Sequence, residues 1–240
     1  MLQRVRDLVG RRVNLVHRLD RGASGCLIFS YSDEEKATED NDSVFDNDST
    51  GATTALMEAM QSAEATKTYV ALVNGDGFRG GEDLTLKGWF DVDEPVKDEN
   101  GKLIDDSITE LRFVASVQLT DKPAQDPAGK SACLVLARPK SGRWHQVRQH
   151  CMLMGHPILG DSTHGLSRTN RIWREKRGLP KERVCLHLAR VDLPPTEFTP
   201  DGIQASCPIP KDMKTMIEIS MPSLLVGEAK HVLEDAGVIL

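Results

Sequence analysis

Two short segments of the chain, far apart in the sequence, hold the side chains best suited to chemistry. The first, HRLDRGASG, places Asp20 between Arg18 and Arg21 on a stretch bordered by Gly22 and Gly25. Nearby positive charge favours the charged form of a carboxylate, so Asp20 is expected to be ionised. An ionised, positioned carboxylate can act as a nucleophile, a general base or a metal ligand. For RLDR taken alone, a surface ion pair is the alternative interpretation.

The second segment, RPKSGRWHQVRQH, is predicted to begin a helix at Ser141, whose hydroxyl suits an N-cap. The helix is predicted to end at Gly155. Its apolar residues recur at steps of three and four, which indicates one buried stripe. The stripe consists of Trp144, Val147, Cys151 and Met154.

The arginines of this segment differ in where they are expected to point. Arg143 and Arg148 lie about 140° apart around a helix, so they need not share a face. Arg148 flanks the buried stripe and is expected to reach inward. A partly buried arginine requires a carboxylate partner, and Asp20 is the partner we predict. His145 and His150 do not have the HExxH spacing of a zinc helix, and packing or capping is the alternative for them.

The surrounding sequence predicts an α+β fold in one domain, residues 1 to 240. A mixed, mainly antiparallel sheet flanked by helices and loops is expected, with an active-site cleft across its middle. Alternating or continuous apolar runs predict the strands, at residues 12–16, 26–31, 67–74, 108–119, 131–139 and 184–193. Helices are predicted at residues 54–65, 211–220 and 228–236. Residues 76–110 are expected to be irregular with short strands. Residues 33–53 are acidic and too polar to bury a core, so we predict a disordered insertion there.

The net charge of −6 hides an asymmetry along the chain. Residues 33–66 hold ten acidic residues against one lysine, whereas residues 138–183 hold eleven Lys or Arg against three acidic residues. A polyanion responds to local potential, so the basic segment could bind nucleic acid despite the net charge. A solvated surface is the alternative for a basic run considered alone.

Composition restricts the cell compartment and excludes several classes of protein. The five cysteines are odd in number and lack CxxC pairs, which favours reduced, mostly buried thiols and argues against a zinc site. No apolar run approaches the ~18 residues that a membrane span needs. The opening segment MLQRVRDLVGRR lacks the apolar centre of a secretory signal. We therefore expect a cytoplasmic protein without a membrane partner.

Three motifs in order along the chain resemble those of the RluA-type pseudouridine synthases. They are VHRLDRGASG, KTYVALVNG and RPKSGRWHQVRQHCMLMGHPILGD. The continuation DSTHGLSRTNRIWREKRGL resembles, more narrowly, the branch that contains tRNA pseudouridine synthase C. The resemblance implies the pseudouridine synthase fold and an enzyme that isomerises uridine within RNA, without metal or organic cofactor. It favours tRNA as the substrate, and a monomer is expected.

The resemblance also implies roles for residues at matching positions. Asp20 would be the catalytic nucleophile, Arg148 its partner, and Tyr69 the aromatic ring that packs on the target uracil. Arg18 would help to hold the opened RNA stack, and Val147 would form an apolar wall beside the base. The other predicted substrate-binding residues are Arg21, Lys67, Arg143, His145, Arg168, Arg171 and Arg174. The last three belong to a basic strip, residues 168–183, that we expect to contact phosphates, while Trp173 within it is expected to be buried.

Two alternatives and one departure accompany this interpretation. The same chemistry could act on ribosomal RNA, or the chain could be a catalytically silent RNA-binding protein or RNA chaperone. The combination of Asp20, Tyr69 and Arg148 argues against silence. Related enzymes carry further strands before the HRLD motif, whereas only sixteen residues precede it here. The N-terminal strands of the family are therefore expected to be missing.

Overall fold

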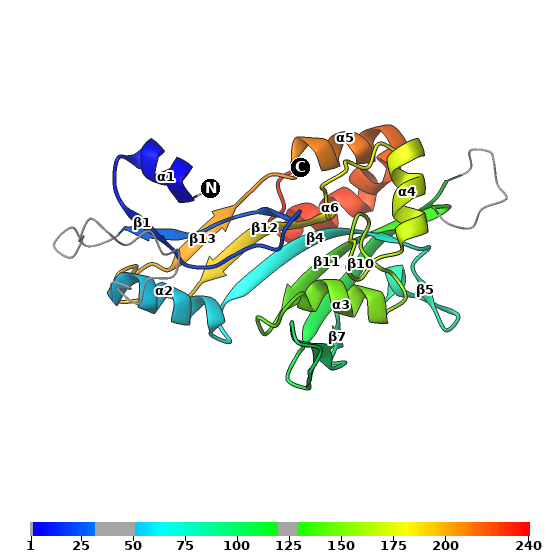
Figure 1. Cartoon of the computed structure of the whole chain (residues 1–240). Helices are drawn as coiled ribbons and strands as arrows, with labels where there is room; N and C mark the ends of the chain where they lie inside the picture. The colour runs from blue at the N-terminus through cyan, green and yellow to red at the C-terminus, as the bar shows by residue number, and fades with distance from the viewer. Residues whose placement is uncertain (1, 32–50, 120–128) are drawn as a thin grey trace.

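A single large sheet runs through the centre of the computed structural model, which describes residues 2–31, 51–119 and 129–240. Its path consists of six antiparallel strands, and one short parallel strand is added at the side of β12 (Figure 1). In spatial order the strands are β13 (Ile203–Ser206), β12 (Leu186–Leu193), β4 (Thr66–Asn74), β11 (Ser131–Pro139), β10 (Thr109–Gln118) and β7 (Phe90–Val92), with β2 (Ser24–Gly25) beside β12. The mixed, mainly antiparallel sheet confirms the predicted α+β fold.

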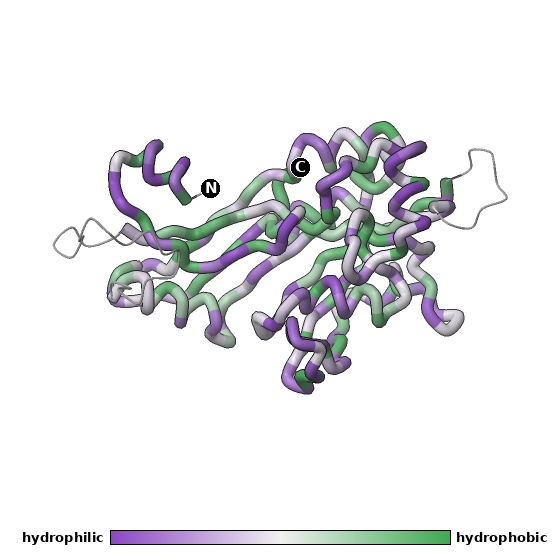
Figure 2. Tube along the Cα trace, viewed as in Figure 1, coloured by the Kyte–Doolittle hydropathy of each residue, from purple (hydrophilic) through white to green (hydrophobic). Residues whose placement is uncertain are grey.

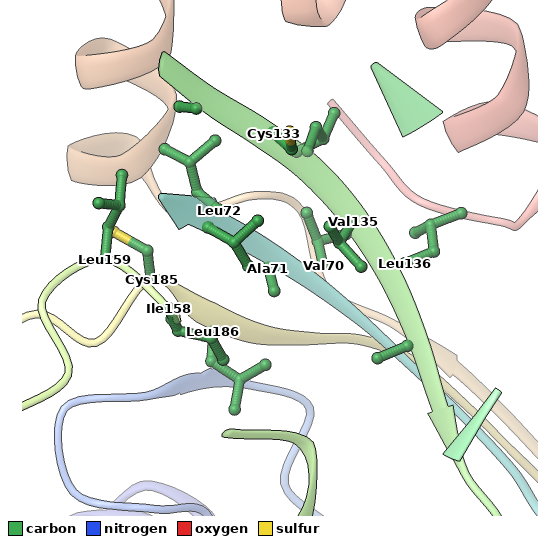
Figure 3. Packing of buried hydrophobic residues seen from close by; sticks show 14 of the residues in the cluster. Val70, Ala71, Leu72, Cys133, Val135, Leu136, Ile158, Leu159, Cys185 and Leu186 are labelled. Carbon is green, nitrogen blue, oxygen red and sulfur yellow. The ribbon is translucent and has the colours of Figure 1, made fainter. Parts of the chain in front are cut away.

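The two central strands, β4 and β11, follow directly from their sequences. Continuous apolar runs indicate strands that are buried on both faces. Val70 to Val73 are fully buried, and they pair with residues of β11 in a register that places Val135 opposite Ala71. Side chains of the two strands pack together in the main core, and Ile158 and Leu159 cover them from the loop after α3 (Figure 3).

Helices lie on both sides of this sheet. The structure has α1 (Leu2–Val9), α2 (Gly51–Gln61), α3 (Gln146–Leu153), α4 (Ser167–Lys176), α5 (Lys211–Ser220), the short η3 (Pro222–Leu225) and α6 (Gly227–Asp235). The predicted C-terminal helices are confirmed to within one residue at either end. Hydrophobic residues concentrate along the central strands, whereas α1 is largely hydrophilic and buries none of its residues (Figure 2). Across the described ranges, no helix combines the length and apolar character needed to cross a membrane.

The excursion between β4 and β10 is made of short pieces, as expected. It contains β5 (Phe78–Arg79), β6 (Glu82–Asp83), η2 (Leu84–Leu86), β7, β8 (Val96–Lys97) and β9 (Leu103–Ile104). The two-stranded β8–β9 ribbon meets α3 through Gln149, whose side chain accepts from the backbone N–H of Lys97 at 2.9 Å and donates to its C=O at 2.8 Å. The excursion therefore supports the helix that carries part of the candidate site.

A second, smaller core lies where the N-terminal segment meets the sheet. The hairpin of β1 (Val13–Leu15) and β3 (Phe29–Tyr31) flanks this core, and its buried members are Val16, Cys26, Ile28, Leu56, Met60, Leu188, Val191 and Leu193. Of the strand predicted at residues 26–31, only the last three residues form a strand, β3. Of the predicted insertion, residues 33–50 lie outside the described residues. Gly51 to Thr53 do not belong to a disordered segment, because they form the first turn of α2 and Thr53 is buried.

Candidate active site

Asp20 lies on a tight loop that is fixed against the edge of the sheet. Its backbone C=O accepts from the N–H of Ala23 at 3.0 Å, which closes the turn. At Gly25, where φ is 136°, a Cβ would lie only 2.3 Å from the carbonyl oxygen of Leu188. Only glycine fits such a close approach to β12. The Asp20 side chain, 30% exposed, therefore projects from a backbone that is held in place.

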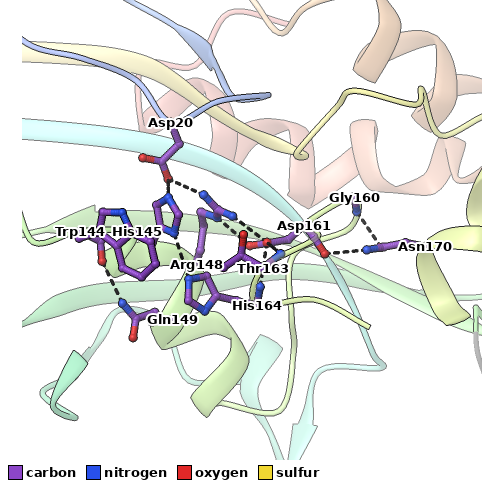
Figure 4. A network of polar contacts seen from close by, with 10 residues as sticks. All are labelled: Asp20, Trp144, His145, Arg148, Gln149, Gly160, Asp161, Thr163, His164 and Asn170. Carbon is purple, nitrogen blue, oxygen red and sulfur yellow. Dashed lines mark hydrogen bonds and ion pairs between the residues drawn. The ribbon is translucent and has the colours of Figure 1, made fainter. Parts of the chain in front are cut away.

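Arg148, in the first turn of α3, lies between two carboxylates (Figure 4). Its Nη1 donates to Asp20 Oδ2 at 3.2 Å. Its Nε and Nη2 donate to the two carboxylate oxygens of Asp161, both at 2.7 Å. The contact with Asp20 that the sequence led us to expect is present. The bidentate partner of the arginine is nevertheless Asp161, whose side chain is fully buried.

Asp161 is stabilised as an anion despite its burial. Its Oδ1 accepts from the backbone N–H groups of Thr163 and His164 at 2.8 and 2.9 Å, in addition to the guanidinium of Arg148. Burial alone would raise the pKa of this carboxyl, but these hydrogen bonds outweigh it and hold the pKa below its ordinary value. The backbone C=O of Asp161 is also fixed, because the side chain of Asn170 donates to it at 2.7 Å.

Tyr69 reaches the same region from β4. It is paired with Leu188 of β12 and Ala137 of β11, so it sits between the two cores and packs against both. Burial raises the pKa of its hydroxyl, and the negative charge of Asp20 raises it further. The phenol therefore stays protonated at neutral pH and lies within the electrostatic field of Asp20.

A cluster of three aromatic rings meets the carboxylate of Asp20 through one of them, His145. His145 Nε2 lies 4.0 Å from Asp20 Oδ2, and Nδ1 of the same ring lies 3.1 Å from His164 Nε2, so one imidazole donates to the other. Trp144 stacks on His145 with ring centroids 3.8 Å apart and an interplanar angle of 21°. Burial lowers the pKa of both imidazoles, which favours their neutral forms at neutral pH. His145 has a φ of 51°, a value otherwise found only at glycines within the described ranges.

The helix begins later than the sequence led us to expect. Ser141 is not its N-cap, because His145 precedes the first helical residue. Instead Ser141 Oγ donates to the side-chain oxygen of Gln146 at 2.8 Å, and the N–H of Arg143 donates to the same oxygen at 3.0 Å. These bonds hold the segment before α3 as a turn. Trp144 consequently lies outside the helix and is 37% exposed, so its predicted place in the buried stripe is wrong.

The arginines that flank Asp20 in sequence point elsewhere. Arg18 is exposed. Arg21 is 97% exposed, and its guanidinium lies 4.0 Å from Glu182. The cation in contact with Asp20 is therefore Arg148, 128 residues further along the chain, rather than either sequence neighbour.

Three other predicted substrate-binding residues have structural contacts of their own. Lys67 donates from Nζ to the C=O of Met60, near the end of α2, at 3.0 Å. Arg143 is bound to Asp106, through its backbone C=O at 2.9 Å and its carboxylate at 2.8 Å. Val147 is buried in the main core.

The basic strip is only partly available for binding. Arg168 and Arg171 are exposed on α4, and Arg174 is half-buried one turn further on. Trp173 is fully buried, as predicted. Arg183 is not a free member of the strip, because its guanidinium is bound to Asp212 at 2.6 to 2.9 Å.

Sequence reasoning missed two functional candidates, Asp161 and His164. A signal for the first was present, since an aspartate that ends the apolar run PILG is expected to be buried and to need a cation. His164 had no such signal, because its place beside His145 depends on how the loop after Asp161 folds back onto α3. The prediction of a central cleft stays a prediction. A cavity of about 650 Å³ lies elsewhere, lined by residues of α5, η3, α6 and the C-terminal segment, none of them a predicted site residue.

The site contains one partly exposed carboxylate, Asp20. The phenol of Tyr69 and the imidazoles of His145 and His164 in the same region are neutral at neutral pH. Arg148 carries one positive charge against two carboxylates, so the group retains one net negative charge at the exposed member, Asp20. Within the described residues, Asp20 accepts a hydrogen bond at Oδ2 from Arg148 and none at Oδ1. No group of three or more His, Cys, Asp or Glu in the described part of the chain is arranged to hold a metal ion.

Comparison with solved structures identifies the class of fold. No family model matches the chain. The solved human protein RNA Pseudouridylate Synthase Domain Containing 1 superposes with a TM-score of 0.61 at 21% identity, covering 97% of this chain and 83% of that one. Human RNA Pseudouridylate Synthase Domain Containing 4 gives 0.56 at 17% identity, covering 90% and 80%. The fold is that of the pseudouridine synthases.

Sequence relatives narrow the class to a family. The tRNA pseudouridine synthase C of Vibrio vulnificus is 32% identical over 192 residues, covering 80% of this chain and 70% of that protein. The tRNA pseudouridine synthase C of Salmonella typhimurium is 30% identical over 203 residues, covering 80% and 67%. This chain therefore belongs to the family of RNA pseudouridine synthases that includes tRNA pseudouridine synthase C, and it is an isomerase that acts on RNA. The resemblance found in its three motifs is confirmed.

Proposed function

We propose that this enzyme converts a uridine of tRNA into pseudouridine, with the carboxylate of Asp20 as nucleophile and the target nucleotide flipped out of its helix. One observation carries the proposal. Asp20 and Arg148, from two motifs 128 residues apart, meet at 3.2 Å and leave one carboxylate oxygen unbonded within the described residues. The raised pKa of Tyr69, caused by burial and then by the charge of Asp20, supports its place in the same site.

The reaction requires a reactive carboxylate and a closed surface for the detached base. The glycosidic bond from N1 of uracil to C1′ of ribose breaks, the uracil turns, and a bond from C5 to C1′ forms. The proton leaves C5 and one is gained at N1, so the product is an isomer of the substrate. Asp20 would react either at the ribose or at the uracil ring during this sequence. The fixed loop of Asp20 suits both routes, because each requires a defined position for the attacking oxygen.

Flipping the nucleotide requires contacts that compensate for the lost stacking. Extruding a base from a duplex costs a few kcal/mol. Stacking on an aromatic side chain returns about 1–3 kcal/mol per base. Tyr69 is the ring that we propose to pack on the target uracil, since it is fixed by strands on both sides and feels the charge of Asp20. Arg18, exposed two residues before Asp20, would contact the opened RNA.

Support for tRNA as the substrate comes from the family and from the charge of α4. The relatives in the comparison are named for tRNA. The exposed arginines of α4, Arg168 and Arg171 together with the half-buried Arg174, would contact phosphates outside the reaction centre. Phosphate contacts position a nucleic acid without reading its sequence.

Pseudouridine mapping of cellular RNA, with and without this protein, tests the proposal. A tRNA uridine that is modified only when the wild-type enzyme is present, and not when Asp20→Asn replaces it, is the expected result. Dependence confined to ribosomal RNA would overturn the tRNA assignment and leave the chemistry intact. Full modification by Asp20→Asn would overturn the role of Asp20.

A further inference from the structure

We propose that Trp144, held against His145 and His164, stacks on an RNA base next to the target nucleotide and so positions the substrate. The proposal rests on the proposed function, because it concerns the RNA that Asp20 modifies. It adds a positioning residue that is distinct from Tyr69, which approaches the site from β4.

The position of the rings is the first argument. The imidazole of His145 lies between the indole and Asp20, with its Nε2 4.0 Å from the Asp20 carboxylate and its ring stacked on Trp144 (Figure 4). His164 contacts both rings edge to face, at centroid distances of 5.5 Å from Trp144 and 5.2 Å from His145. The aromatic group therefore extends from the reactive carboxylate outward to an indole that remains 37% exposed.

The backbone and hydrogen bonds around the three rings hold them in place in the absence of RNA. The backbone C=O of Trp144 accepts from the side chain of Gln149 at 2.9 Å, and Gln149 is itself buried and bound to β8. The backbone of His145 is held in the left-handed conformation, at φ 51°, which residues other than glycine rarely adopt. Such strain persists only where the surrounding structure enforces it, and it concentrates at functional sites. A rigid aromatic surface binds a base with little loss of conformational entropy.

Trp144 also remains partly exposed close to the proposed reaction centre. Trp173, by comparison, is fully buried and contributes to the core. Trp144 leaves over a third of its surface in water, and only the ring of His145 separates it from the partly exposed carboxylate of Asp20. When a nucleotide is flipped out, its neighbour in the strand loses a stacking partner on one face. An uncharged aromatic surface next to the reaction centre fits that exposed base face, because base–aromatic stacking tolerates any base.

The test uses an RNA hairpin that carries the uridine identified by mapping, made with and without the base on each side of that uridine. Dissociation constants are measured in the Asp20→Asn background, which prevents turnover. For intact RNA, Trp144→Ala is expected to weaken binding by about 5- to 100-fold, the equivalent of one lost base stack. Trp144→Phe should restore most of the affinity. Phe78→Ala removes another exposed aromatic ring, on β5, and should leave RNA affinity unchanged.

The decisive comparison is between the RNAs. With RNA that lacks one particular neighbouring base, Trp144→Ala should no longer weaken binding. Neither the protein with Trp144 nor the variant then has a base to stack on at that place. In turnover assays with Asp20 intact, the variant should raise KM more than it lowers kcat. Two outcomes would overturn the stacking role: unchanged affinity of Trp144→Ala for intact RNA, or an equal loss of affinity on substitution with every RNA that lacks a base. Neither outcome contradicts the proposed function as long as the wild type forms pseudouridine. Absence of pseudouridine formation by the wild type would overturn the proposed function and the stacking role with it.

Discussion

Replacing each carboxylate beside Arg148 with an amide should separate chemistry from stability. Asp161 is fully buried and accepts two 2.7 Å hydrogen bonds from Arg148. Asparagine keeps its volume but removes the charge, which leaves a buried guanidinium only partly compensated by Asp20. Removing one partner of a buried ion pair costs about 3–5 kcal/mol. Because Asp20 remains in contact with Arg148, we expect the lower end, about 3 kcal/mol, for Asp161→Asn.

Asp20→Asn should show the opposite pattern. The side chain is 30% exposed and accepts a single hydrogen bond at 3.2 Å, so its loss should cost less than about 1 kcal/mol of stability. Turnover should nevertheless disappear, because the amide is not a nucleophile. A residual single-turnover rate above about one tenth of wild type, equivalent to 1.4 kcal/mol in the barrier, would refute the assignment.

Thermal unfolding and single-turnover conversion of RNA measure the two effects. For a chain of this size, about 3 kcal/mol corresponds to a fall in Tm of roughly 6–12 °C. Asp212→Asn is the matched control, because Asp212 also binds an arginine, Arg183, through several hydrogen bonds but is 39% exposed. Its Tm should fall by only a few degrees. Equal losses of Tm in Asp161→Asn and Asp212→Asn would refute the reasoning that burial makes the difference.

Three further predictions concern acid, metal and salt. Burial lowers the pKa of six histidines, His17, His145, His150, His156, His164 and His187. As pH falls, the unfolded chain binds protons at these histidines before the folded chain does. The contribution to stability should therefore be full above pH 6.5 and decrease as pH falls below that value. Greater resistance to urea at pH 5.5 than at pH 7.5 would contradict this. Turnover should survive exhaustive dialysis against EDTA, and a loss that zinc but not magnesium restores would show a metal role. Arg171→Ala combined with Arg174→Ala should weaken RNA binding mainly at moderate salt and lower the salt slope by somewhat under one unit per contact, with little change in rate at saturating RNA. A collapsed rate at unchanged affinity would place these arginines in the reaction centre.

The parts of the fold that follow from sequence are those in which burial dictates the pattern. The predicted strand at residues 131–139 matches β11, and the predicted helix at 211–220 matches α5. In both, apolar spacing reflects a face that packs on the core. Helix α1 gave no such signal, because none of its residues is buried. The early start predicted for α3 failed because the side chain of Gln146 forms bonds with the preceding turn, which local helix propensity does not register.

The candidate site divides in the same way. The residue types around Asp20 and Arg148 indicate their chemistry, and their contact was expected from the need of a buried arginine for a carboxylate. The role expected for Tyr69 came only from the resemblance to a known family. The ion pair given as the alternative for RLDR is not the one that forms, since Arg21 is almost fully exposed and lies beside Glu182. Adjacent residues on a loop can point in different directions, so sequence proximity is a weak guide to charge pairing. His164, by contrast, could not be predicted, because its place beside His145 depends on how the loop after Asp161 folds back onto α3.

For the nucleophilic role that we propose for Asp20, the sharing of Arg148 would allow the carboxylate to be held in place without engaging both of its oxygens. A guanidinium that gave its two-pronged face to Asp20 would engage both carboxylate oxygens and reduce their ability to attack. Here Asp161 occupies that face through both its oxygens, and two backbone N–H groups hold Asp161 in turn. A single N–H of Arg148 remains for Oδ2 of Asp20. Arg148 therefore contacts the Asp20 carboxylate through one oxygen only, while the buried Asp161 fixes the guanidinium. This would leave the other Asp20 oxygen for the proposed attack.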